Sequence, residues 1–195
     1  WTSSMYFMYL VDRLGGPEVF ANAATRSGGS FEDPIFVRAG EMVQEMVENG
    51  YFNEGFNGLD YDTGQSRQLL YSGLAAMELM GNWQISTMRS ENPEFEAESL
   101  GFFPFPAIDG GAGDPSSVVG TVGDNYYSIS SACPHPDEAF EMITYQIDDE
   151  SIPLRAADGK IPPVTGFETD DPALQEIIDL IGNAASVQLW YDQYL

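Results

Sequence analysis

Side chains suited to nucleophilic or metal chemistry are few in this 195-residue chain. Cys133 is the only cysteine and His135 the only histidine. A zinc site needs several nitrogen or sulfur ligands, and a cysteine nucleophile needs a base held beside it. One residue of each type argues against both, and we predict no catalytic, metal or cofactor site built on them.

Carboxylates, in contrast, are abundant, with 31 Asp and Glu against 7 Lys and Arg and a net charge of −24. A glycosidase needs two carboxylates across a cleft, and so many acids leave that alternative open. The sequence has no Gly-x-Ser-x-Gly elbow, P-loop or dinucleotide fingerprint. The acids are mostly scattered and lack the Asp-x-Asp-x-Asp-Gly order of a calcium loop, which suits a solvated surface. Such a charge also repels nucleic acid.

Aromatic rings offer a different chemistry, the binding of neutral sugars, whose weakly apolar faces accept stacked rings while amides and carboxylates bond their hydroxyls. Trp83 follows Gly-Asn after an apolar run over 74–80 that we predict to be a strand. Ligands bind at the carboxyl ends of strands in α/β sheets. We therefore expect Trp83 to stack on a ligand; the alternative is that it starts the next helix and fills the core. Asn82 would bond a ligand hydroxyl or cap that helix.

Four amphipathic repeats predict the helices that would position these groups, at 5–14, 33–50, 136–147 and 171–182. Asp-Pro supplies an N-cap and an N1 proline to the second and fourth of them. The residues expected to form the buried face of the third helix are Ala139, Phe140, Met142, Ile143 and Ile147.

Three short apolar runs without helical period, at 74–80, 100–105 and 126–130, are predicted to be buried strands. Strands that alternate with helices of this length indicate an α/β sandwich with a largely parallel sheet.

Four segments, in order, resemble the extracellular solute-binding proteins of ABC sugar importers, of the maltodextrin-binding type. They are a helix ending in Gly-Gly at 6–16, Gly-Leu-Ala-Ala-Met to Gly-Asn-Trp at 73–83, a segment at 122–140 and another at 159–191. They cover roughly the second half of a typical member. The resemblance implies that the amino-terminal lobe, a secretion signal and a lipoprotein cysteine would lie upstream.

The resemblance also implies a periplasmic-binding-protein-like (type II) α/β fold, in which two lobes joined by crossing segments close on the ligand. Most of this chain would belong to the carboxy-terminal lobe. Residues 1–122 would form its first part, residues 123–167 would cross the hinge and add a strand and a helix to the other lobe, and residues 168–195 would return.

By the same resemblance, Trp83 and Trp190 match two sugar-stacking positions and would line one wall of the cleft. Asp124 and Asn125 would lie at the crossing, where polar groups in a buried strand need partners. Further aromatic candidates for ligand contact are Trp1, Tyr6 and Tyr191.

The function implied is capture of a sugar, an oligosaccharide above all, outside the cell and its delivery to the permease subunits of an ABC importer. The protein would be a monomer without cofactor or catalysis, in the periplasm or lipid-anchored at the cell surface. Three alternatives stay open: a binder of another solute such as a peptide or polyamine, a glycoside-acting enzyme, and a structural or adhesive domain.

Overall fold

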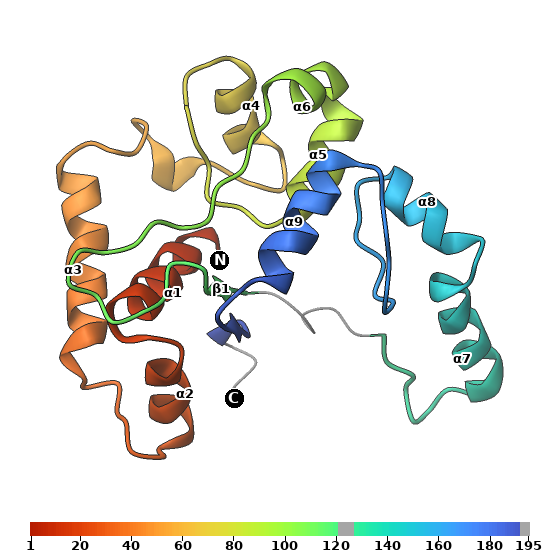
Figure 1. Ribbon diagram of the computed structural model, residues 1–195, viewed down its shortest axis with the longest axis horizontal. Coiled ribbons are helices and arrows are strands. Elements are labelled where there is room, and N and C mark those ends of the chain that lie inside the picture. The colour runs from red at the N-terminus through yellow and green to blue at the C-terminus, as the bar shows by residue number, and fades with distance from the viewer. Residues whose placement is uncertain (121–126, 192–195) are drawn as a thin grey trace. The chain divides into compact units, whose positions relative to one another are not determined.

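The computed structural model describes residues 1–120 and 127–191 of the chain. The chain divides into two compact units, each assembled from segments that are distant in sequence (Figure 1). The first unit comprises Trp1–Met80, Phe103–Val122 and Ala184–Leu195, and the second comprises Gly81–Phe102 and Gly123–Asn183.

The core of the first unit lies between three helices, α1 (Thr2–Gly15), α2 (Glu18–Thr25) and α3 (Pro34–Glu48). α1 packs against both of the others (Figure 1). The helices predicted at 5–14 and 33–50 are confirmed, and the Asp33 carboxylate accepts a hydrogen bond from the Ile35 amide at 2.9 Å as the predicted N-cap. The buried residues of this core are Leu10, Val11, Phe20, Ala23, Phe36 and Ala39.

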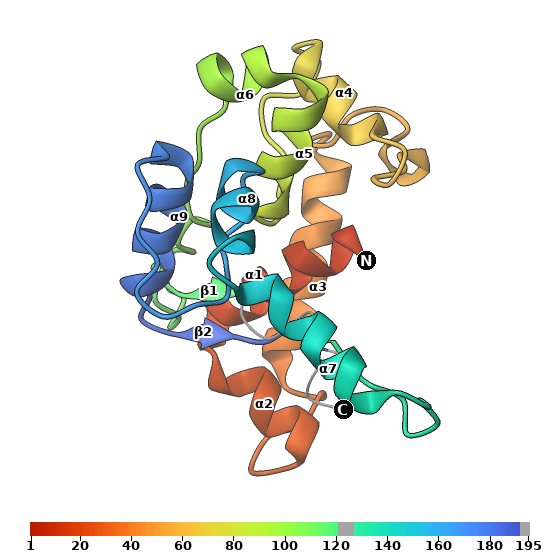
Figure 2. The same cartoon turned by 90° about the vertical axis from the view of Figure 1, so that its right-hand side faces the viewer.

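Two short parallel strands, β1 (Val118–Val119) and β2 (Val187–Gln188), complete the first unit together with a 3-10 turn, η1 (Phe56–Gly58), and α4 (Gln65–Tyr71). The strands pair Val118 with Val187 and lie side by side (Figure 2). This pair connects the end of the 103–122 segment to the start of the 184–195 segment.

The second unit contains only helices and loops in its described residues: α5 (Trp83–Glu91), α6 (Pro93–Ser99), α7 (Pro136–Thr144), the 3-10 turn η2 (Tyr145–Ile147), α8 (Ser151–Ala157) and α9 (Pro172–Gly182). The helices predicted from 136 and from 171 are confirmed. The Asp171 carboxylate accepts from the amides of Ala173 (3.0 Å) and Leu174 (3.3 Å), as the predicted cap. It also pairs with Arg89 at 2.8 Å, which joins α9 to α5.

The prediction of buried strands at 74–80 and 100–105 is wrong, and residues 127–130 are likewise not in a strand. Leu74 and Met77 are 68% and 69% exposed, and Phe103 is 64% exposed. A strand needs a hydrogen-bonded neighbour, and none of the described residues pairs with these runs. Pro104 also lacks the amide that a ladder requires.

The predicted buried face of α7 is also wrong. Phe140 is 62% exposed and Met142 66% exposed, Ile147 is exposed as well, and Ala139 and Ile143 are half-buried. The amphipathic pattern formed the helix, but it contacts chiefly η2 among the described elements, so its apolar side chains have little to pack against.

Two further features bear on function. Within residues 1–120 and 127–191, none of the helices combines the length and apolar character that a membrane crossing requires. In the same part of the chain, no group of three His, Cys, Asp or Glu side chains is placed to hold a metal ion.

Candidate ligand-binding residues

Trp83 is the first residue of α5 and is half-buried. Its ring folds back over Gly81, where a Cβ atom would collide with the six-membered part of the indole. The glycine two residues earlier therefore allows this ring orientation. The strand expected before Trp83 does not exist, so the strand-end argument for this residue is wrong. Asn82 is exposed and its side chain makes no capping hydrogen bond, although it occupies the N-cap position.

Trp190 lies two residues after β2 and is half-buried. Its indole lies on Gly120, which follows β1 and has φ of +77°. A Cβ at Gly120 would approach indole atoms Cε2 and Cζ2 to 2.7 and 2.8 Å. The indole Nε1 is buried, and no hydrogen-bond partner for it exists among the described residues.

Tyr191, the neighbour of Trp190, contributes to the core of the first unit. Its ring stacks on Phe20 with centroids 3.4 Å apart and planes 6° from parallel. Its hydroxyl donates to the carbonyl oxygen of Met8 at 3.3 Å. These contacts fix the chain directly after Trp190 and give Tyr191 a structural role whether or not it meets a ligand.

Trp1 and Tyr6, near the start of α1, each meet aromatic rings of the segment before α4. Trp1, 60% exposed, meets Tyr61 edge-on with centroids 5.2 Å apart. Tyr6 meets Phe52 edge-on at 5.4 Å, and Phe52 meets Phe56 at 5.1 Å. Burial raises the pKa of Tyr6, opposed by a backbone hydrogen bond with Leu79, so its hydroxyl is neutral at physiological pH.

The predicted site residues are distributed over both units. Trp83 and Asn82 belong to the second unit, whereas Trp190, Tyr191, Trp1 and Tyr6 belong to the first. A common wall for the two tryptophans therefore stays a prediction. Asp124 and Asn125 lie outside the described residues.

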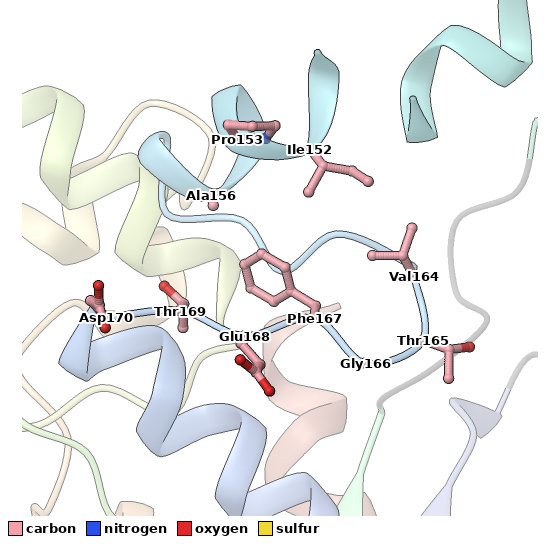
Figure 3. Close-up of a pocket in the computed structure, with 10 residues that line it drawn as sticks. All are labelled: Ile152, Pro153, Ala156, Val164, Thr165, Gly166, Phe167, Glu168, Thr169 and Asp170. Carbon is pink, nitrogen blue, oxygen red and sulfur yellow. The ribbon is translucent and has the colours of Figure 1, made fainter. Parts of the chain in front are cut away.

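An open hollow of about 550 Å³ in the second unit was not anticipated. Figure 3 shows Val164 and Phe167 of a loop turned toward Ile152 and Ala156 of α8. Glu168 and Asp170 contribute carboxylates to its lining. None of the predicted site residues lines it. No sequence pattern pointed to this hollow, because a loop rather than a helix or strand shapes one side of it.

The sequence profile of a known family, described as bacterial extracellular solute-binding protein, matches residues 1–152. The chain is also similar to a chain solved in work on the biochemistry and structure of xylan utilization by the thermophilic bacterium Caldanaerobius polysaccharolyticus. The two are 24% identical with a TM-score of 0.82, and the match covers all of the present chain and 50% of the other. The chain thus spans half the length of that solved relative. No curated protein matches the chain in sequence.

The family match and the structural likeness show the fold that the resemblance implied, a periplasmic-binding-protein-like α/β fold. The family consists of binding proteins and its members are extracellular. The match extends over more than half of the chain, from α1 into α8. The chain belongs to the bacterial extracellular solute-binding protein family.

Proposed function

We propose that the protein carrying this chain captures a sugar outside the cell and delivers it, chemically unchanged, to the permease subunits of an ABC importer. Membership of an extracellular solute-binding family supports the capture step. The solved relative from work on xylan utilization supports a saccharide as the solute. The protein acts as a monomer, free in the periplasm or lipid-anchored at the cell surface.

The observation that carries the proposal is the setting of the two tryptophans. Trp83 and Trp190 are both half-buried, and each indole lies against a glycine. An indole that is supported in this way loses little conformational freedom when a sugar ring stacks on it. We assign the stacking role to these two rings, with Trp1, Tyr6 and Tyr191 as further aromatic contacts.

The charge of the chain narrows the class of sugar. A net charge of −24 repels anionic solutes, so uronic acids and sugar phosphates are disfavoured relative to a neutral oligosaccharide. Hydroxyl groups of a neutral ligand would then bond Asn82, Asp124 and Asn125. The same charge favours a polyamine as the competing ligand.

We assign residues 1–122 and 168–195 to one lobe of a two-lobed clamp, and residues 123–167 to a crossing and a contribution to the other lobe. The step from the first to the second compact unit at Val122–Gly123 supports a crossing there. The second compact unit also contains residues 81–102 and 168–183. Our assignment of these two segments to the first lobe is therefore the part of the proposal that most needs a test.

Ligand-dependent stabilisation of the full-length protein tests the proposal. A saccharide at 100 times its Kd should raise the free energy of unfolding by about 2.7 kcal/mol. We expect this from xylo- or malto-oligosaccharides, which chromatography should recover uncleaved. Stabilisation by an amino acid, peptide or polyamine, with none by saccharides, would refute the sugar assignment, and cleaved products would refute the absence of catalysis.

Variants separate stacking from general stability. Trp83→Ala and Trp190→Ala should each weaken saccharide binding by roughly 1–3 kcal/mol while the protein stays folded. Tyr51→Ala is the matched control, because this aromatic residue is 71% exposed and has no assigned contact with ligand. Equal losses in all three variants would contradict the assigned roles.

A further inference from the structure

Arg13 is a charged side chain in the interior of the first unit, 1% exposed. Its Nη2 donates to the carbonyl oxygens of Phe105 (3.0 Å), Pro115 (3.1 Å) and Ser117 (2.9 Å), and its Nε donates to Phe105 at 3.2 Å. Its Nη1 pairs with the Asp12 carboxylate at 2.5 Å. One planar guanidinium of α1 thus holds three carbonyls of the segment that leads into β1.

The loop ahead of β1 is fitted to the same end of α1. The amides of Ala112 and Gly113 donate to the carbonyl oxygens of Leu14 (3.0 Å) and Arg13 (3.1 Å), which belong to the last turn of the helix. A Cβ at Gly111 or Gly113 would collide with α1 carbonyl oxygens. Arg13 therefore acts on a segment that already lies in close contact with its own helix.

The segment held by Arg13 continues directly into the β1–β2 pair. The Ser117 hydroxyl lies 2.8 Å from the Ser186 hydroxyl, at hydrogen-bonding distance. The Val118 amide donates to the Ser186 carbonyl at 3.0 Å. A shift of the Ser117 carbonyl would move both strands, because these bonds and the parallel register tie β2 to β1.

At the far end of the strand pair, Gly120, the residue directly after β1, supports the Trp190 indole. The Gly120 amide donates to the Gln188 carbonyl at 2.9 Å, and the Trp190 ring lies on Gly120 itself. A continuous set of hydrogen bonds and contacts therefore runs from the Arg13 guanidinium to the Trp190 indole, entirely within the first unit.

We propose that Arg13 is a positioning residue for Trp190: its guanidinium fixes β1, and β1 with β2 sets the place of the indole that receives the ligand. The ligand part of this statement rests on the proposed function. Arg13 is buried beneath its own carbonyl partners, so we assign it no direct contact with the ligand. Its effect on binding is transmitted through Ser117, Gly120 and Trp190.

Lysine at position 13 would keep the positive charge and lose the planar fork. One ammonium group cannot reproduce both the Nε and Nη bonds to Phe105 together with the bonds to Pro115, Ser117 and Asp12. Arg13→Lys should therefore release β1 without leaving Asp12 as an isolated buried charge. If Arg13 had only a structural role, Arg13→Lys would lower stability without moving Trp190 in the folded protein. The experiment must therefore measure the position of Trp190 separately from stability.

The experiment uses the full-length protein with Trp1→Phe and Trp83→Phe, in which Trp190 is the reporter within this chain; any tryptophan outside it is changed to Phe as well. Emission and acrylamide quenching are recorded without ligand. Arg13→Lys should shift the emission to the red and increase quenching, because the buried Nε1 becomes accessible. Arg89→Lys is the matched control: Arg89 pairs with Glu96 and Asp171 in the second unit, and it should lower stability without changing emission.

Gly120→Ala keeps the proposal testable if Arg13→Lys does not fold, because it acts at the other end of the same path and should give the same spectral change. In the parent with Trp83 intact, Arg13→Lys should also weaken saccharide binding about tenfold, or about 1.4 kcal/mol. Unchanged Trp190 emission in folded Arg13→Lys, or in folded Gly120→Ala, would overturn the positioning role. Shifted emission in a protein that binds no saccharide would uphold the positioning and refute the proposed function instead.

Discussion

The two tryptophan sites look alike but are built differently. Trp83, the first residue of α5, rests on Gly81 in the turn just before the helix, so a local turn is enough to set the ring. Trp190 rests on Gly120, seventy residues away, and depends on β1, β2 and the buried guanidinium of Arg13. A local support is independent of the remaining fold, whereas a long-range support transmits any change in the fold to the ring.

The arginine ion pairs of the two units also differ, in how deeply they are buried. Arg13 and Asp12 in the first unit are both fully buried, with Asp12 Oδ2 unbonded among the described residues. Arg89 in the second unit bridges Glu96 and Asp171 with 24% of its side chain exposed. Water can solvate the partly exposed groups around Arg89 but not the buried Arg13–Asp12 pair. Substituting Arg13 should therefore destabilise the fold far more than substituting Arg89.

The largest expected difference is between the two arginines. Arg13→Met should cost about 3–5 kcal/mol of folding free energy, because it leaves the buried Asp12 carboxylate without its ion pair and several carbonyls without a hydrogen-bond donor. Arg89→Met should cost roughly 0.5–2 kcal/mol, because its carboxylate partners reach water. Urea unfolding of the full-length variants measures both. Equal costs would show that burial does not separate the two networks.

The next contrast compares the glycines. Gly120→Ala should cost about 1–3 kcal/mol, since alanine is strained at φ of +77° and its Cβ would press on the Trp190 indole. Gly81→Ala has no positive φ to disfavour alanine, and the ring it meets is the far end of one side chain. We expect a cost of about 1 kcal/mol or less there, with thermal unfolding as the measurement. A larger loss at Gly81 would reverse the comparison.

A smaller contrast lies in the acid response. Burial raises the pKa of Asp171, but the Arg89 pair and the cap amides outweigh it, so the pKa is lowered. Asp171 therefore contributes stability above the unfolded-state value near pH 4, and this is lost as the pH falls through its folded-state pKa. Asp171→Asn keeps the cap and should lose about 1 kcal/mol at pH 7 but little at pH 3. Parallel pH profiles for variant and parent would contradict this.

Asp12 should respond with the opposite sign. Burial raises its pKa in spite of the adjacent Arg13. Its contribution to stability is therefore present below the unfolded-state pKa and is lost as the pH rises through the folded-state value.

The smallest effect concerns the surface charge of both units. A net charge of −24 should weaken the fold by self-repulsion at low ionic strength, and sodium chloride should relieve it. We expect the melting temperature to rise by a few degrees as the salt increases from a few tens of millimolar. A constant or falling value would indicate that specific partners already neutralise the acids.

Sequence patterns were most reliable where local physics decides. Asp33 and Asp171 cap their helices as predicted, because a carboxylate before Pro satisfies amides within three residues. The runs at 74–80 and 100–105 failed because an apolar run becomes a strand only beside a partner, and partners are set by the whole fold. α6 was not predicted, because its few apolar residues make no long repeat. α5 was anticipated only through the alternative that Trp83 starts a helix, and the helix does begin there.

The candidate site residues likewise separate into those that local sequence indicates and those that only the fold reveals. The Gly-Asn-Trp order pointed to Trp83, although the strand argument attached to it was wrong. Trp190 was selected by resemblance, and nothing in the sequence connected it to Gly120 or Arg13. Arg13 reads as an ordinary residue near a helix end, and only the fold brings three distant carbonyls to its guanidinium.

The central proposal is that Trp83 and Trp190 contact one sugar ligand. The direct measurement is a titration of the full-length protein with a bound oligosaccharide, followed through the indole N–H resonances of ¹⁵N-labelled tryptophan. We predict that both resonances shift with the same Kd, and that each disappears from the spectrum of its Trp→Phe variant. Saturation of the protein with sugar while both indole resonances stay unmoved would contradict the account.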